Sequence, residues 1–253
     1  MKFRQKLTIA AAVALGWLAA AALVVPAAGA AERGQNNLTV VELYTSQGCS
    51  SCPPADALLG RLAKRDGILA LSFHVDYWDY IGWKDPYGNA TNSARQQAYK
   101  RSFDRSYVYT PQMVINGMIE TTGSNEAGVL AGIGRAGSAS KVPIGLSRDQ
   151  SGGLRISVAA LDNPIQAAVW LALFDLQQTT RVRRGENRGR TIKNYNVVRE
   201  FSKIGEWNGT ATALTVSADK LKPHAGRGCG VFLQSELKGP ILGAATINLE
   251  PQR

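Results

Sequence analysis

Apolar and polar positions follow two different patterns along this 253-residue chain, and the change falls near residue 137. Before that point, runs rich in β-branched and aliphatic residues predict buried strands at 38–44, 68–75, 112–115 and 118–122. Stretches with helical spacing lie among them, at 55–65, 94–103 and 126–136. This order of strands and helices predicts an α/β domain with a βαβ unit, which we place at residues 37–137.

After the small-residue segment 137–140 the helical spacing disappears. Short strand-like runs follow, separated by Gly, Asn-Pro and Lys-Pro turns: 144–146, 154–160, 167–175, 194–201, 209–216, 229–235 and 241–249. Such a series is typical of an antiparallel β-sandwich. We therefore expect an all-β, sandwich-like C-terminal domain at residues 142–251.

The N-terminus has the pattern of a secretory signal peptide. Lysine or arginine at positions 2, 4 and 6 precedes an apolar stretch at 7–25, and Ala28-Gly29-Ala30 supplies small residues for cleavage. We expect residues 1–30 to be removed and the mature chain to be periplasmic or secreted. The apolar stretch also approaches the length of a spanning helix, so an uncleaved N-terminal membrane anchor is the alternative.

The formal net charge of the chain is +10, and subtracting the three signal-peptide cations leaves +7. Much of this excess is local, in a basic region that runs from Arg181 to Lys203. An exported protein meets no genomic DNA, so we expect no nucleic-acid partner. An anionic partner here would be a phospholipid headgroup, an acidic glycan or an acidic protein face. A solvated basic loop and hairpin is the simpler interpretation.

Cys49 and Cys52 form a C-x-x-C pair between the predicted strand 38–44 and the predicted helix 55–65. Two cysteines at this spacing can close a small disulfide. A helix N-terminus also favours a thiolate, which is the nucleophilic form of cysteine. We expect Cys49, outermost on the loop, to be exposed and to attack a substrate disulfide, and Cys52 to resolve the product. The alternative is a structural disulfide, because oxidation is the ordinary state of such a pair in an exported protein.

The soft metal ligands of the chain are Cys49, Cys52, His74 and His224, and two cysteines with one histidine can hold copper. We expect instead that His74 is a core or edge-strand histidine, that His224 is distant, and that no metal or other cofactor is bound. Cys229 makes the cysteine count odd. We expect it to be buried as a small hydrophobic residue, with pairing between molecules as the alternative.

Aromatic residues crowd the segment after the predicted strand 68–75: Tyr77, Trp78, Tyr80, Trp83 and Tyr87. Rings with one polar end often line binding clefts. We interpret Tyr77 and Trp78 as part of a peptide- or glycan-binding groove beside the C-x-x-C pair. The alternative, stronger for Trp83, is a satellite core packed under the predicted helix 94–103.

The order strand, C-x-x-C, helix, strand, helix, and then a strand pair introduced by Thr110-Pro111, resembles the thioredoxin fold. The resemblance implies that Cys49 is the nucleophile, Cys52 the resolving cysteine and Pro111 the cis-proline that faces them. It also implies that Thr110 offers its backbone to an extended substrate peptide. Glu42, an acid in an apolar strand, would match the buried proton acceptor of thioredoxins. A carboxylate at the strand edge, or paired with Lys or Arg, is the other interpretation of Glu42.

A closer resemblance covers nearly all of the mature chain. Segments 42–56, 75–86, 109–117, 188–190 and 195–199 are similar to a family of exported bacterial thioredoxin-like proteins, catalogued as a domain of unknown function (DUF1223). This resemblance implies a fold and a compartment, but hardly any activity.

The chain departs from ordinary thioredoxins around its cysteines. Gly48 replaces the usual Trp, Ser50-Ser51 the usual Gly-Pro, and Pro53 the usual Lys. Serine hydroxyls beside a thiolate stabilise the reduced form, which favours oxidant behaviour.

We therefore expect thiol-disulfide exchange on an exported protein or peptide client, through Cys49 and Cys52, with Pro111 shaping the substrate groove. A non-enzymatic envelope binding module with a structural disulfide is the second interpretation, and copper delivery is the third. The first two differ in whether the disulfide can be reduced and Cys49 then reacts.

Overall fold

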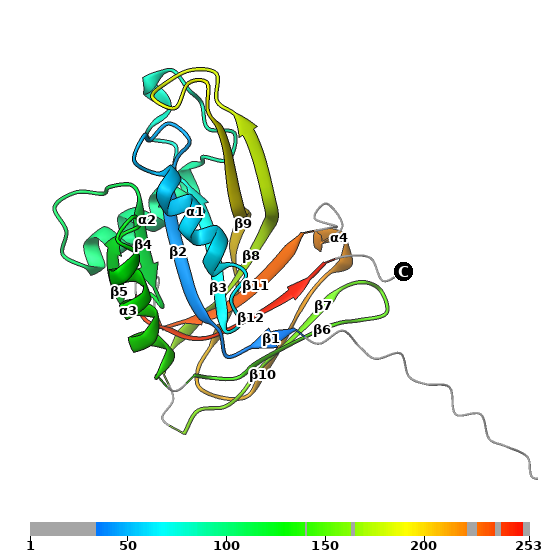
Figure 1. Ribbon diagram of the computed structural model, residues 1–253. Helices are drawn as coiled ribbons and strands as arrows, with labels where there is room; N and C mark the ends of the chain where they lie inside the picture. Colours follow the sequence, from blue (N-terminus) through cyan, green and yellow to red (C-terminus); the bar gives the residue numbers. More distant parts are fainter. Residues whose placement is uncertain (1–33, 140, 163–164, 222–226, 236–238, 250–253) are drawn as a thin grey trace, which may run out of the picture. The chain divides into compact units, whose positions relative to one another are not determined.

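Strands and helices alternate in the first half of the chain, in the order that the hydrophobic pattern predicts (Figure 1). The computed structural model describes residues 34–139, 141–162, 165–221, 227–235 and 239–249. The elements of this half are β1 (Gln35–Asn36), β2 (Thr39–Thr45), α1 (Pro53–Leu62), β3 (Ile68–His74), a 3-10 turn (Asp79–Ile81), α2 (Ala90–Ser102), β4 (Gln112–Ile115), β5 (Ile119–Thr122) and α3 (Glu126–Gly137).

The second half is mostly strand, as predicted. Its elements are β6 (Ile144–Arg148), β7 (Leu154–Val158), β8 (Ala167–Arg181), β9 (Thr191–Trp207), β10 (Thr212–Val216), the short helix α4 (Ala218–Leu221), β11 (Gly228–Gln234) and β12 (Ile241–Asn248). Strands β8 and β9 are much longer than the predicted runs 167–175 and 194–201. Beyond Asp175 most positions of β8 are exposed or half-buried, so the apolar pattern ends before the strand does.

One large mixed sheet spans both halves. Within the described residues its order is β1-β12-β11-β8-β9-β3-β2-β4-β5, and a separate antiparallel sheet has the order β10-β7-β6. Strand β9 joins the large sheet through a parallel pairing with β3, at Ser72 and Val197. The molecule is thus a mixed α/β protein in which the two predicted domains share a sheet, and the described residues fall in one compact unit.

The two faces of β2 have different partners, because side chains alternate along a strand. Val41 and Leu43 pack in one buried cluster with Leu59 of α1. Val40 and Tyr44, on the other face, pack in a second cluster with Tyr99 of α2. This alternation decides which side chains of β2 point toward the helix that follows the cysteines.

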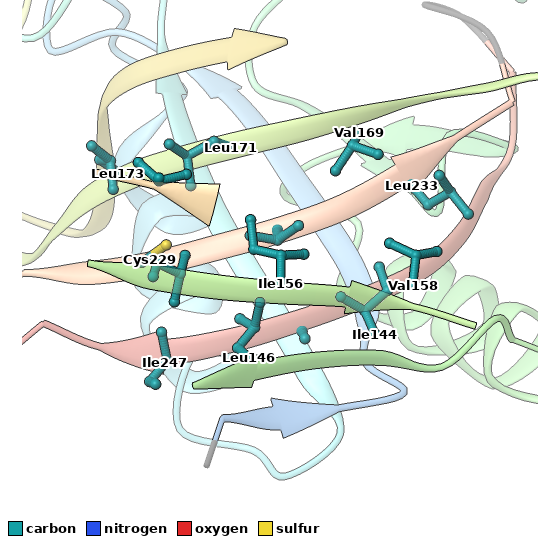
Figure 2. Close-up of a cluster of buried hydrophobic side chains, with 14 of the residues drawn as sticks. Ile144, Leu146, Ile156, Val158, Val169, Leu171, Leu173, Cys229, Leu233 and Ile247 are labelled. Carbon is teal, nitrogen blue, oxygen red and sulfur yellow. The ribbon is translucent and has the colours of Figure 1, made fainter. Parts of the chain in front are cut away.

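A third cluster holds the small sheet against the large one (Figure 2). Ile144 of β6 and Ile156 of β7 belong to it, with Leu171 of β8, Cys229 of β11 and Ile247 of β12. Two sheets packed over an apolar layer are the arrangement of a sandwich.

Two helices start earlier than predicted. Helix α1 begins at Pro53, because a proline at the first helical position loses no hydrogen bond there. Helix α2 begins at Ala90, where the Asn89 side chain accepts a hydrogen bond from the Asn92 backbone. The first turns of α2 are polar, so hydrophobic spacing revealed only its later part.

No helix among the described residues is long and apolar enough to cross a membrane. The predicted signal peptide, residues 1–30, and His224 lie outside the described residues.

Candidate functional site

The two cysteines lie in the loop between β2 and α1 and form a disulfide, with their Cα atoms 5.5 Å apart. Cys52 is the N-cap of α1. Cys49 was expected to be exposed, but its exposed fraction is 1%, and that of Cys52 is 0%. The expectation was wrong because other segments, far away in the sequence, pack over this loop.

The first covering segment is the turn before β4. The Thr110–Pro111 peptide bond is cis, as the thioredoxin resemblance implies. The Thr110 carbonyl oxygen lies 3.8 Å from the Cys49 Sγ. A disulfide sulfur carries no proton, so in the oxidised protein this is a contact and not a hydrogen bond. After reduction, the Thr110 carbonyl oxygen is an acceptor within reach of the Cys49 thiol. Cys49, Cys52, Thr110 and Pro111 thus come together.

The aromatic segment forms the second covering element. The Trp78 indole Nε1 donates to Thr110 Oγ1 at 2.8 Å, and the Tyr80 ring stacks on Trp78 with 81% of Tyr80 exposed. A Cβ at Gly48 would lie 3.2 Å from the Trp78 Cβ, so the aromatic segment packs closely against the residue before Cys49. The Tyr77 hydroxyl donates to Gln96 Oε1 at 3.0 Å. Trp78 therefore lies at the disulfide, whereas Tyr77 is directed toward α2.

The third covering element is the turn between β8 and β9, residues 182–190, which we call the hairpin tip (Figure 1). The Asn187 Nδ2 donates to the carbonyl oxygens of Gln47 and Cys49, both at 2.9 Å. Glu186 Oε2 accepts from the Ser50 backbone N–H at 3.0 Å. Asn187 is fully buried, whereas Glu186 is exposed. Sequence reasoning missed both residues; their one signal is an acid and an amide within a strongly basic run.

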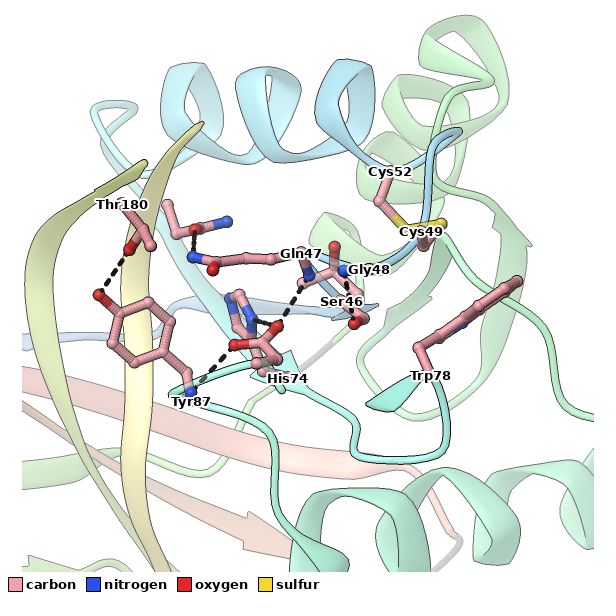
Figure 3. Close-up of polar contacts among 12 residues, drawn as sticks. Ser46, Gln47, Gly48, Cys49, Cys52, His74, Trp78, Tyr87 and Thr180 are labelled. Atoms are coloured by element: carbon pink, nitrogen blue, oxygen red, sulfur yellow. Dashed lines mark hydrogen bonds and ion pairs between the residues drawn. A yellow bond between two sulfur atoms is a disulfide. The ribbon is translucent and has the colours of Figure 1, made fainter. Parts of the chain in front are cut away.

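A buried polar cluster lies beneath the cysteine loop (Figure 3). The His74 Nδ1 and Asp85 Oδ2 are 2.7 Å apart, and Asp85 also accepts from the backbone N–H groups of Gln47 and Tyr87. Burial acts to raise the pKa of Asp85, but the attraction to His74 and these hydrogen bonds outweigh it and lower that pKa. Burial acts to lower the pKa of His74, but Asp85 reverses this and raises it. The attraction between the two groups therefore favours a proton on His74 and a negative charge on Asp85.

Asp56 is the titratable group nearest to Cys52 along the chain. It lies one helical turn after Cys52, on the same side of α1, and is 2% exposed. The Thr45 hydroxyl donates to Asp56 Oδ1 at 3.0 Å. Burial raises the pKa of Asp56 to about 7, although the charge of His74 and the hydrogen bond from Thr45 oppose the rise. A buried carboxyl that titrates near neutral pH is suited to accept a proton.

Glu42 does not occupy this position. It is fully buried and makes a bidentate ion pair with Arg95, at 2.6 and 2.9 Å. The hydroxyls of Tyr44 and Tyr99 also donate to it. Because Val41 and Leu43 face α1, Glu42 faces the opposite side of the sheet, away from Cys52. The structure therefore has the alternative pairing with arginine, and the match to a thioredoxin proton acceptor was wrong.

The remaining candidates, His74 and Cys229, lie in the protein interior. Among the described residues, no group of three or more His, Cys, Asp or Glu side chains is arranged to hold a metal ion. His74 is fully buried in its strand. Cys229 is a free thiol with 0% exposure in the core between the two sheets, so its predicted burial is confirmed. Burial raises the pKa of Cys229 to about 12, which keeps it protonated.

Most of the basic region is on the surface around the hairpin tip. The exposed cations are Arg181, Arg183, Arg184, Arg188, Arg190, Lys193, Arg199 and Lys203. A groove of about 680 Å³ lies between α1 and the start of β9, and Arg61, Lys64 and Lys193 are among its lining residues. The groove begins at Pro53, next to Cys52. Two of the exposed cations of the basic region, Arg190 and Lys193, thus line this groove.

Comparison with known proteins identifies relatives but no activity. The family model described as "Protein of unknown function (DUF1223)" matches residues 40–234. A solved structure of Protein AGR_C_4864 from Agrobacterium tumefaciens is 31% identical, with a TM-score of 0.74, over 85% of this chain and 96% of that chain.

Two further comparisons add nothing. An endonuclease/exonuclease/phosphatase from Beutenbergia cavernae matches 46% of this chain and 24% of its own at 18% identity, but its TM-score of 0.20 carries no argument. No curated protein matches. The family model matches residues 40–234, more than half of the chain, so the chain belongs to the family of proteins of unknown function DUF1223.

Proposed function

We propose that this protein is an exported, thioredoxin-like thiol-disulfide oxidoreductase that acts through Cys49 and Cys52. The observation that carries the proposal is the Cys49–Cys52 disulfide packed against the Thr110 carbonyl, directly before the cis Pro111. The disulfide also lies between a strand and the start of a helix. A second feature that supports the proposal is Asp56, a titratable group one helical turn after Cys52. The disulfide also fits an oxidising compartment outside the cytoplasm, as the N-terminal pattern predicts.

The proposed exchange proceeds in two steps. The Cys49 thiolate attacks a client disulfide, so that a mixed disulfide forms and one client sulfur leaves as a thiolate. Cys52 then gives its proton to Asp56 and attacks the Cys49 sulfur, which releases the second client sulfur and leaves Cys49–Cys52 oxidised. The client gains two electrons, and a separate exported dithiol protein must reduce the pair again. The same steps in reverse oxidise a client dithiol.

Burial of the pair makes access part of the proposal. Cys49 can meet a client sulfur only if a covering segment moves, and in the aromatic segment Tyr80, which stacks on Trp78, is 81% exposed. An extended client would then run along Thr110, whose backbone already lies at the sulfur.

The same burial favours a second candidate function, a binding module stapled by a structural disulfide. In that case the aromatic segment and the basic surface bind an envelope component, and the cysteines never react. The exposure of only 1% at Cys49 is the specific observation in its favour.

A mixed-disulfide trap tests the proposal. Reduced Cys52→Ala protein, also carrying Cys229→Ala, is mixed with a peptide that contains a disulfide, and the products are weighed by mass spectrometry. We expect a stable adduct on Cys49 that dithiothreitol releases. The matched control, Cys49→Ala with Cys229→Ala, should form an adduct much more slowly, because the proposed exchange assigns the first attack to Cys49. If the Cys52→Ala protein forms no adduct, the disulfide is structural.

A further inference from the structure

The hairpin tip is fastened to the cysteine loop by buried hydrogen bonds. Both donor hydrogens of the Asn187 amide are used on the carbonyls of Gln47 and Cys49, and its oxygen accepts from Arg190 at 3.1 Å. A buried side chain with all its hydrogen bonds made has little freedom. The residue before it, Glu186, is therefore held in one place relative to the cysteines.

A second set of contacts joins the hairpin tip and the start of β9 to the cysteine loop and the aromatic segment. Gln47 Nε2 donates to Asn194 Oδ1 of β9 at 3.0 Å, and the Trp83 indole donates to Gln47 Oε1 at 3.2 Å. A Cβ at Gly185 would lie 3.2 Å from the Trp83 Cβ, so the tip also packs closely on the aromatic segment. The hairpin tip and the start of β9 are thus held against the cysteine loop and the aromatic segment by several contacts rather than by one.

The carboxylate of Glu186, at the hairpin tip, contacts the backbone between the two cysteines. Glu186 Oε2 accepts from the N–H of Ser50, the residue that follows Cys49. The hydrogen bonds from Ser50 lower the pKa of Glu186, so this carboxylate is ionised at neutral pH. The positive potential of the α1 N-terminus is also weakened here, because Pro53 and Pro54, in its first turn, have no N–H.

A negative charge at this place affects the two redox states differently. The disulfide is uncharged and is almost indifferent to Glu186. A thiolate at Cys49 would stand beside the carboxylate and be destabilised by it, since like charges disfavour ionisation. The dithiol state is therefore the one that the carboxylate disfavours.

We propose that the hairpin tip sets the redox poise of the Cys49–Cys52 pair, with Asn187 fixing the tip and Glu186 opposing the Cys49 thiolate. The proposal deepens the exchange function and rests on it for its biological meaning. Glu186 acts through the cysteine loop, by its contact with Ser50, so it is a positioning residue. Its effect makes the pair a weaker oxidant than Ser50 and Ser51 alone would suggest.

Equilibration with dithiothreitol measures this effect without any client. Dithiothreitol gives two electrons and two protons to the pair; the Cys49–Cys52 bond breaks, and a disulfide forms within the reagent. We compare the equilibrium constant for the wild type and for Glu186→Gln, which keeps an acceptor for Ser50 but removes the charge. The matched control is Glu206→Gln, an exposed glutamate at the other end of β9 that pairs with Lys203.

We expect Glu186→Gln to shift the equilibrium toward the dithiol by about two- to fivefold, the size of an interaction between two charges that solvent screens. The shift should shrink in 1 M salt, because Glu186 is exposed and its charge is screened. In a Cys52→Ala background, the pH at which Cys49 is half alkylated should move downward as well. Glu206→Gln should change none of these quantities.

Equal equilibrium constants for the wild type and Glu186→Gln would overturn the proposal, and so would an equal shift in Glu206→Gln. These outcomes are separate from the exchange function. If the mixed-disulfide trap fails while Glu186→Gln still shifts the equilibrium, the tip tunes a structural disulfide. If the trap succeeds and the equilibrium does not move, exchange stands and the role of Glu186 is lost.

Discussion

The Asn187 amide donates to the Cys49 carbonyl across 138 positions of the sequence. This bond links the turn of the long β8–β9 hairpin to a cysteine loop that belongs to the other half of the chain. It is one of two buried bonds from the same Nδ2 atom, so the loop and the hairpin tip depend on each other.

Replacing Asn187 tests that dependence. Asn187→Ala leaves the carbonyls of Gln47 and Cys49 without their donor in a buried place, which should cost about 2–4 kcal/mol of unfolding free energy. Urea unfolding of the oxidised protein measures it. The control Asn208→Ala removes an exposed turn residue and should cost at most about 1 kcal/mol. Equal costs for the two variants would show that the tip is not fastened to the loop.

Asp56 should make stability depend on pH. Its pKa is raised to about 7 in the folded protein, so the folded state binds a proton that the unfolded state releases near pH 4. Stability from this group is therefore full below about pH 4, falls as the pH rises, and is lost above about pH 7.

Asp56→Asn should remove this pH dependence and raise the unfolding free energy at pH 8 by about 2–4 kcal/mol. Urea unfolding at pH 5 and pH 8 measures the change. The exposed Asp66→Asn serves as control and should leave the slope between these pH values as in the wild type. A parallel slope in Asp56→Asn and the wild type would exclude Asp56 as the group that titrates near neutral pH.

Glu42 should matter for stability and not for the thiols. Glu42→Gln leaves Arg95 as an uncompensated buried charge, which should cost about 3–5 kcal/mol. The double variant Glu42→Gln with Arg95→Met removes both charges and should recover much of that loss. Because Glu42 lies on the far face of β2, the alkylation rate of Cys49 in the reduced double variant should match the wild type. A large change in that rate would restore Glu42 as a partner of the cysteines.

Trp78 should control access to the sulfur. Trp78→Phe removes the indole N–H that binds Thr110 and leaves a smaller ring beside the cysteine loop, so iodoacetamide should modify Cys49 in the reduced protein several times faster. The lost hydrogen bond should cost about 1 kcal/mol. Tyr80→Phe keeps the exposed stacked ring and should react as the wild type does. Equal rates for all three proteins would place the access route elsewhere.

Local patterns predicted most elements and the cysteine pair, because these depend on neighbours in the sequence. The strand before Cys49, the helix after Cys52 and the turn at Thr110-Pro111 are all visible in short windows. The cover over Cys49 is not, since Asn187 reaches the loop only through the pairing of β8 with β9 and of β9 with β3.

The choice between Glu42 and Asp56 shows a second limit. An acid in an apolar strand attracts attention, whereas an acid in the first turn of a helix is ordinary. Only the packing of α1 on the Val41 and Leu43 face shows that Glu42 points away from Cys52 and that burial changes Asp56. Burial, and with it the pKa, is a property of the tertiary structure.

The reduction potential of the Cys49–Cys52 pair, measured together with the alkylation of Cys49 in the native reduced protein, tests the central claim most directly. The exchange function predicts a potential above about −300 mV and a Cys49 that is alkylated far faster than the buried Cys229. A potential well below about −300 mV, with Cys49 as unreactive as Cys229, would contradict it and make the disulfide a structural staple.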